Sequence, residues 1–110
     1  MGDHFHHPDD LRLFKQMKEL APADFEAWQK LNSIVGREDG AVPPKYRELI
    51  ALAVNVTTQC PYCIDVHAKA AKRLGATREE LVETFMIAAA MRAGGAATHG
   101  AMALKFYDAT

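Results

Sequence analysis

The chain has 110 residues, with 13 basic and 14 acidic side chains and a formal net charge of −1. This length is typical of a single domain, and the balanced charge provides no basic surface for nucleic acid. The N-terminus lacks the apolar segment of a signal peptide. The longest apolar runs, 49–54 and 85–91, are too short to cross a bilayer. We therefore expect a cytoplasmic protein that binds neither nucleic acid nor membranes.

The first forty residues predict two helices. Pro8 suits the first turn of a helix that ends near Leu20. A second helix is indicated by an apolar stripe at helical spacing, and it ends in the region 36–40. The residues of this stripe are Phe25, Trp28, Leu31, Ile34 and Val35. Residues 1–7 are expected to form a flexible tail, which accounts better than a metal site for His4, His6 and His7.

The middle of the chain predicts two further helices joined by a short turn. Two prolines open the third helix, which runs from Lys45 to about Thr58. Its apolar residues lie nearly all round the helix, which indicates burial on most sides. Pro61 suits the first turn of a fourth helix, which ends at Gly75.

The last third of the chain predicts a fifth and a sixth helix. Thr77 followed by Glu80 is a capping-box pattern that starts the fifth helix. The pair Gly94-Gly95 ends it, and a sixth helix runs to about Tyr107. Both helices are lined with alanine, which buries little apolar area per residue, so a chain of this size needs partners. The sequence therefore predicts an all-α fold of about six helices in a homo-oligomer.

Both cysteines of the chain occur in the segment Cys60-Pro61-Tyr62-Cys63. With Pro61 at the first helical position, Cys60 is the N-cap and Cys63 lies in the first turn. Unpaired backbone N–H groups and the positive end of the helix dipole favour the thiolate form of both sulfurs there. The two residues are also close enough to form a disulfide with each other. In a reducing compartment such a pair is expected to be catalytic or metal-binding.

His67 and Glu48 are the candidate partners of this dithiol. His67 follows Cys63 by four residues and Cys60 by seven, so the three share one helical face. An imidazole there can take the thiol proton. The turn before Pro61 should fold the fourth helix against the third, which can bring Glu48 near His67 to relay protons.

Each of these residues has an ordinary structural explanation when taken alone. The glutamate could be a surface residue near a helix start, the histidine a packed side chain, and the cysteines small buried apolar residues. Their joint occurrence around one helix start favours a functional site.

Glu48, eleven intervening residues, the Cys60–Cys63 turn and His67 together resemble the alkylhydroperoxidase D-like, or carboxymuconolactone decarboxylase, family. The similarity covers about residues 43–107, the core of a single domain 1–110. It includes the proline-rich start, the segment YRELIALAVN, the segment LGATREEL and the alanine-rich end. The resemblance implies an alkylhydroperoxidase D-like helical bundle that assembles as a trimer or, for short chains, a hexamer.

The resemblance also implies thiol peroxidase or disulfide reductase chemistry. Cys63 would be the peroxidatic thiol, Cys60 its resolving partner, and Glu48 with His67 the proton relay. The substrate would be a hydroperoxide or a small disulfide, the reductant a dithiol or a thioredoxin-type partner, and no cofactor is needed. Some family peroxidases have a histidine where this chain has Tyr62. The decarboxylase branch lacks the cysteine pair, so lactone decarboxylation is not expected.

Two other functions fit the same residues. A metal-binding disulfide reductase or a metal-binding protein could hold Zn or Fe with Cys60, Cys63, His67 and Glu48. One short turn without a second Cys-x-x-Cys pair is a weaker metal pattern than that of a zinc finger. A non-catalytic oligomeric scaffold would instead have thiols that behave as free cysteine does. His99 is expected to serve in helix packing.

Overall fold

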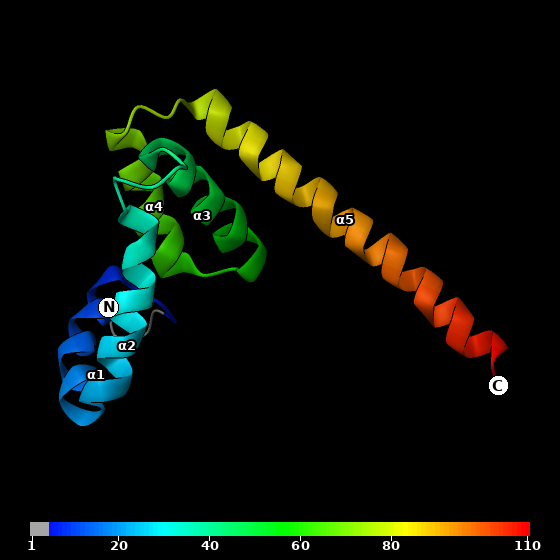
Figure 1. The fold of residues 1–110 in the computed structure, drawn as a ribbon, viewed down its shortest axis with the longest axis horizontal. Coiled ribbons are helices and arrows are strands. Elements are labelled where there is room, and N and C mark those ends of the chain that lie inside the picture. The colour runs from blue at the N-terminus through cyan, green and yellow to red at the C-terminus, as the bar shows by residue number, and fades with distance from the viewer. Residues whose placement is uncertain (1–4) are drawn as a thin grey trace.

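The computed structural model describes residues 5–110, which form helices joined by short turns and include no strand (Figure 1). In chain order the elements are the 3₁₀ helix η1 (Pro8–Leu13), α1 (Phe14–Leu20), α2 (Pro22–Asn32), the 3₁₀ helix η2 (Ser33–Gly36), α3 (Pro44–Thr58), α4 (Pro61–Arg73) and α5 (Arg78–Asp108). The prediction of an all-α fold is confirmed. His4 lies outside the described residues.

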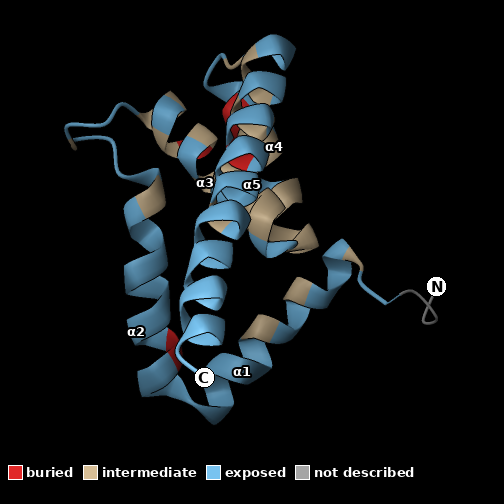
Figure 2. Ribbon diagram, turned by 90° about the vertical axis from the view of Figure 1, so that its right-hand side faces the viewer, coloured by how far each residue is buried: buried red, intermediate tan, exposed pale blue. Residues whose placement is uncertain are grey.

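Helix α3 is the centre of the fold, because it packs against both α4 and α5. Leu52 of α3 and Ala71 of α4 are fully buried, and Ala88 of α5 is nearly so. In Figure 2 the buried positions are confined to a few turns of these helices and one turn of α2. Two of the buried side chains are alanines, which lets the helices approach closely but provides little apolar area.

A two-residue turn reverses the chain between α3 and α4. Gln59 ends α3 in the left-handed conformation, with φ 58° and ψ 50°. The backbone N–H groups of Gln59 and Cys60 both donate to the carbonyl of Asn55, the latter at 3.2 Å. Cys60 is the N-cap of α4 and Pro61 its first residue, as the sequence predicted. This turn holds α4 against α3 and so places the start of α4 beside the end of α3.

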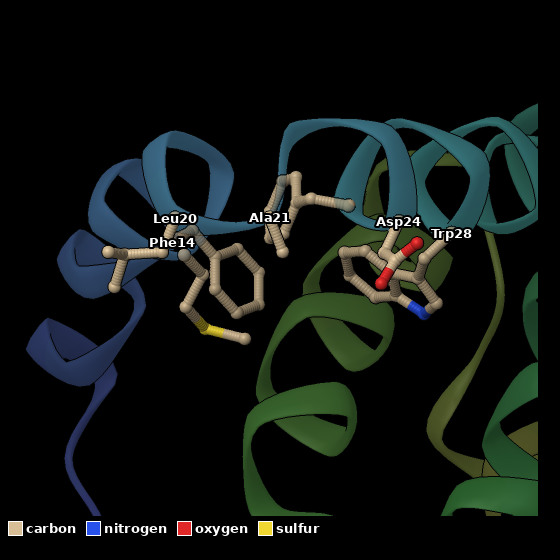
Figure 3. A pocket seen from close by; sticks show the side chains of 7 residues that line it. Phe14, Leu20, Ala21, Asp24 and Trp28 are labelled. Atoms are coloured by element: carbon tan, nitrogen blue, oxygen red, sulfur yellow. The ribbon is translucent and has the colours of Figure 1, made fainter.

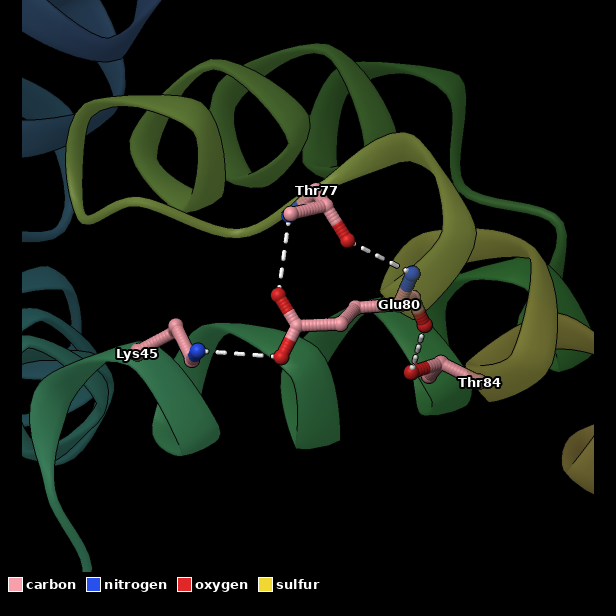
Figure 4. A network of polar contacts seen from close by, with 4 residues as sticks. All are labelled: Lys45, Thr77, Glu80 and Thr84. Carbon is pink, nitrogen blue, oxygen red and sulfur yellow. Dashed lines mark hydrogen bonds and ion pairs between the residues drawn. The ribbon is translucent and has the colours of Figure 1, made fainter.

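The predicted capping box starts α5 (Figure 4). Glu80 N–H donates to Thr77 Oγ1 at 3.0 Å, and Thr77 N–H donates to Glu80 Oε1 at 2.9 Å. Lys45 of α3 donates to the second carboxylate oxygen of Glu80 at 2.9 Å. These hydrogen bonds, with that of the Thr77 backbone as the main cause, hold the pKa of Glu80 below its usual value. The box therefore also fixes the start of α5 on α3.

The predicted break at Gly94-Gly95 is wrong, since α5 continues through both glycines to Asp108. Glycine in a helix interior costs roughly 0.5–1 kcal/mol relative to alanine, which weakens a helix without forbidding it. The neighbouring alanines have the highest helix propensity and offset that cost. The predicted fifth and sixth helices are one helix of 31 residues.

The N-terminal part forms a helical hairpin with a small core of its own. The rings of Phe14, Phe25 and Trp28 lie with their centroids 5.4–5.5 Å apart, at steep angles to one another. The predicted apolar stripe is shorter than expected, because α2 ends at Asn32 and Ile34 belongs to η2. Helix η2 in turn contacts α3, which connects the hairpin to the rest of the chain.

The molecule is extended for its length. Its radius of gyration is 18.2 Å, against about 13 Å for a compact chain of this size. In Figure 1 the C-terminal half of α5 runs away from the other helices, and every residue from 96 to 110 is exposed. Among the described residues, no helix combines the length and the apolar character required to cross a bilayer.

Candidate active site

The two cysteines are joined as a disulfide at the start of α4, with their Cα atoms 5.4 Å apart. Cys60 is the N-cap, and its sulfur accepts a hydrogen bond from the backbone N–H of Cys63 at 3.4 Å. The first turn of a helix has backbone N–H groups without helical partners, and here one of them points at a sulfur. Reduction of this disulfide would leave a thiolate in an environment that stabilises negative charge.

Glu48 of α3 and His67 of α4 form a partly buried pair next to this turn. His67 Nδ1 lies 2.6 Å from Glu48 Oε2, and the two side chains are 18% and 8% exposed. A carboxylate buried to this extent requires a hydrogen-bonded partner, because its desolvation is otherwise very unfavourable. The proximity expected from the sequence is present, and it comes from the packing of α4 on α3.

The geometry of this pair assigns different tasks to the two ring nitrogens of His67. With Glu48 ionised, its carboxylate only accepts hydrogen bonds, and Nδ1 of His67 is then the donor in this contact. The other nitrogen, Nε2, is then able to take or give a proton. A carboxylate that orients an imidazole in this way is a common arrangement in acid–base catalysis.

Tyr62, between the two cysteines, is held by the N-terminal segment. Its hydroxyl donates to Asp10 Oδ2 at 2.6 Å, and the ring of His6 lies edge-on to it at 6.2 Å between centroids. The backbone N–H of His7 also donates to Asp10, at 3.0 Å. No local sequence signal predicts this contact, because Asp10 and Tyr62 are 52 residues apart.

A cavity of about 420 Å³ reaches the same site. It lies between α3, α4 and the segment that joins α2 to α3, and Cys63 and His67 are part of its wall. Asn55, which sequence reasoning passed over as part of an apolar run, lines it as well. The one available signal was a lone amide in that run.

A larger cavity of about 520 Å³ lies elsewhere, on the helical hairpin (Figure 3). Phe14, Leu20 and Trp28 contribute to its walls, and Asp24 is its one charged residue. It contains neither cysteine nor His67, so it has no part in the dithiol chemistry.

Within the described part of the chain, the donor set expected for a metal is not assembled while the two cysteines form a disulfide. Both cysteine sulfurs are used in the disulfide, and no group of three or more His, Cys, Asp or Glu side chains in residues 5–110 is arranged around a common point. His99 is exposed, and its Nδ1 lies 3.0 Å from the carbonyl of Gly95 in its own helix.

Comparison with known proteins identifies three relatives by sequence. A protein of Paracoccus denitrificans, described as uncharacterised protein 4 in the cox locus, is 49% identical over 70 residues. That match covers 64% of this chain and 63% of the relative, less than two thirds of its length. An uncharacterised protein of Cupriavidus necator is 35% identical over 98 residues, covering 89% and 86% of the two chains. One of Haemophilus influenzae is 38% identical over 97 residues, covering 88% and 85%.

A solved structure and a family profile agree with these matches. The apo form of a carboxymuconolactone decarboxylase family protein from Legionella pneumophila superposes with a TM-score of 0.67 at 36% identity, covering 76% of this chain and 73% of that one. The Carboxymuconolactone decarboxylase family matches residues 22–106, which extends the resemblance into α2, beyond the expected start near residue 43. The family includes peroxidase-like members of the alkylhydroperoxidase D type. This chain belongs to the carboxymuconolactone decarboxylase family.

Proposed function

We propose that the protein is a thiol-dependent peroxidase that cycles Cys60 and Cys63 between dithiol and disulfide. The observation that supports it best is the position of a disulfide-forming pair at a helix N-terminus, one turn before a histidine that a buried glutamate orients. Each part has a defined task in peroxide reduction, and no organic cofactor is required.

The first step reduces the peroxide. The Cys63 thiolate attacks the terminal oxygen of ROOH, the O–O bond breaks, and the sulfur is oxidised to the sulfenic acid Cys63–SOH. The leaving RO⁻ receives a proton from His67 and departs as ROH. Glu48 keeps the imidazole ring of His67 in place while the charge of that ring changes.

The second step forms the disulfide. The Cys60 thiolate attacks the sulfur of Cys63–SOH, hydroxide leaves and is protonated to water, and the S–S bond forms. A dithiol or a thioredoxin-type protein then reduces this bond by exchange and is itself oxidised to a disulfide. The same exchange run on a small disulfide substrate would make the protein a disulfide reductase.

The test is the reaction of the fully reduced protein with one equivalent of peroxide. We expect loss of both thiols, formation of the Cys60–Cys63 disulfide by mass spectrometry of digested protein, and continuous turnover when a dithiol is supplied. A variant with both cysteines replaced by serine is the control. Two unmodified thiols after treatment of folded protein would contradict the proposal.

Metal binding by the same residues is tested on the reduced form, since a cysteine binds Zn or Fe as a thiolate and not as part of a disulfide. Protein purified without a metal column and analysed for metal content separates the two functions. We expect no bound Zn or Fe, and peroxide turnover that a chelator leaves unchanged. A stoichiometric metal that blocks the reaction with peroxide would favour the metal-binding function instead.

A further inference from the structure

The cavity beside the dithiol has mostly apolar walls. Its apolar residues come from α3 and from the segment that joins α2 to α3, and they are Ile34, Val35, Val42, Ile50, Ala51 and Val54. Cys63 and His67 form one side of it. A molecule that reacts with Cys63 by this route would therefore place its organic part among aliphatic side chains, and its reacting oxygen near the sulfur.

Two polar donors of α3 also line this cavity, and they differ in what they bind. Arg47 is committed to the fold, because its Nη1 donates to the carbonyl of Ile34 at 2.6 Å and its Nε to that of Val42 at 2.9 Å. The side-chain Nδ2 of Asn55 is buried and has no acceptor within residues 5–110. A buried donor without a partner costs about 1–3 kcal/mol, so the fold alone gives no reason for an amide there.

The turn between α3 and α4 does not account for the amide either. Asn55 serves that turn through its backbone carbonyl, which accepts from the N–H groups of Gln59 and Cys60. Any residue provides such a carbonyl. Its neighbours in the chain, Val54 and Val56, are apolar. Asn55 also lines the cavity that Cys63 and His67 line, and a molecule bound there would offer its amide an acceptor.

We propose that the Nδ2–H group of Asn55 donates a hydrogen bond to the peroxide oxygen that leaves when Cys63 attacks. This inference rests on the proposed peroxidase function. As the O–O bond breaks, that oxygen becomes RO⁻ before it takes the proton from His67, and a donor already in place stabilises its charge. Removing one such donor from an oxyanion site typically costs 10²–10³-fold in rate.

An amide differs from the histidine relay in its response to pH. His67 gives its proton only when protonated, so its effect follows pH. The Asn55 amide does not titrate, so its effect is the same at every pH. Loss of Asn55 should lower the whole pH–rate profile without moving it, whereas a change in the relay should alter the shape of the profile.

The decisive variant is Asn55→Leu, which keeps the approximate shape and removes the donor. We expect its free energy of unfolding to equal or exceed that of the parent, since an unpaired buried donor has been removed. We expect peroxide to oxidise it 10²–10³-fold more slowly, with an unchanged exchange rate between the disulfide and dithiothreitol. Asn55→Ser keeps a donor and should retain part of the rate. Gln29→Leu, the same kind of change on an exposed turn of α2 outside the cavity, is the control.

The outcomes separate this inference from the function on which it rests. The probes are hydrogen peroxide and cumene hydroperoxide. If the parent reacts with them and Asn55→Leu reacts equally fast, the inference is overturned and the peroxidase proposal stands. A destabilised Asn55→Leu, repeated with Asn55→Ala to exclude a steric effect, assigns the amide a structural role and also overturns it. A parent that reacts with neither peroxide contradicts both.

Discussion

The pair of Glu48 and His67 is unusual in this chain because Glu48 is buried. Glu48, 6% exposed when its backbone is counted with its side chain, is the one buried charged residue among the described residues, and its partner is the histidine one turn after Cys63. Buried carboxylates are retained only where something binds their charge. The pair therefore connects the packing of α3 on α4 with the chemistry proposed at the start of α4.

Removing either member of this pair should slow the reaction with peroxide. His67→Ala removes the proton donor, and general acid–base groups of this kind contribute typically 10²–10⁴-fold. Glu48→Gln still accepts the hydrogen bond of Nδ1 through its amide oxygen, keeps the shape and removes the charge. It should leave the fold intact and lower the fraction of thiolate at neutral pH.

Stopped-flow measurement of peroxide oxidation, together with thiolate absorbance against pH, checks both variants. Glu83→Gln, an exposed glutamate of α5, is the matched control. Parent-like rates in both variants would show that the relay has no role and that the dithiol acts alone.

Asp10 and Tyr62 give a pH-dependent contact between the N-terminal segment and the dithiol turn. The Tyr62 hydroxyl, and after it the His7 backbone N–H, lowers the pKa of Asp10, and the same Asp10 hydrogen bond raises the pKa of Tyr62. Because the pKa of Asp10 is lowered, the contact contributes its full stabilisation at pH values above 3.8, the ordinary pKa. This stabilisation is lost as the pH falls through the pKa that Asp10 has in the folded protein. Because the pKa of Tyr62 is raised, the same contact also contributes stabilisation at pH values below 10.0, the ordinary pKa of tyrosine. This stabilisation is lost as the pH rises through the pKa that Tyr62 has in the folded protein.

Tyr62→Phe should therefore raise the titration midpoint of Asp10 toward 3.8. The measurement is an NMR titration of the Asp10 carboxyl carbon. Tyr46→Phe, at an exposed tyrosine of α3, is the control and should leave it unchanged. An Asp10 midpoint that is the same in the parent and in Tyr62→Phe would show that the hydrogen bond is absent in solution.

Sequence reasoning selected the residues of the candidate site more readily than the residues around them. Cys60, Cys63, His67 and Glu48 could be selected because helix spacing and a proline restart are local signals. The Asp10–Tyr62 contact could not, since it depends on how a distant segment folds back. Asn55 could not be singled out because the cavity around its amide exists only after η2 and α3 have packed.

At the scale of elements, α5 shows where local rules were insufficient. Caps were predicted correctly because they depend on a few adjacent residues, as at Thr77 and Cys60. Whether two glycines end a helix depends instead on the sum of propensities on both sides. Each glycine costs the helix roughly 1 kcal/mol, which weakens α5 without ending it, because helix-forming residues continue to Asp108.

Replacing these glycines with alanine should strengthen α5. A Cβ added at Gly94 or Gly95 meets no atom within 4 Å, so each change should raise the free energy of unfolding by roughly 0.5–1 kcal/mol. Urea unfolding followed by circular dichroism measures this. A loss of stability would mean that the glycines are in close contact with another copy of the chain. Gly36→Ala, a substitution outside any α-helix, is the control for the effect of an alanine substitution alone.

At the scale of the molecule, one chain leaves too much apolar surface uncovered. Its accessible area is 8837 Å², whereas a compact monomer of 12.1 kDa exposes about 6,000 Å². This excess of accessible area per chain is of the size that permanent protein–protein interfaces bury. Many of the exposed apolar side chains belong to α5, and they are Val82, Met86, Ile87, Met91, Met102, Leu104, Phe106 and Tyr107.

We therefore predict a symmetric homo-oligomer, a hexamer or a trimer, in which α5 is covered by other copies. Light scattering at micromolar concentration should give six or three times the 12.1 kDa of the chain. Met91→Glu and Phe106→Glu should reduce that mass, and Lys18→Glu, a change of charge at an exposed position of α1, should not. A monomeric mass for the parent would contradict this prediction.

The central claim, that Cys63 reduces peroxide and Cys60 resolves it, is tested most directly on the two cysteines themselves. The measurement is the chemical state of the remaining thiol after peroxide treatment of Cys60→Ser and of Cys63→Ser, with dimedone as the sulfenic acid trap. The account predicts a trapped sulfenic acid at Cys63 in Cys60→Ser, without turnover, and no rapid reaction with peroxide in Cys63→Ser. A sulfenic acid that forms at Cys60 in Cys63→Ser, and none at Cys63 in Cys60→Ser, would contradict it.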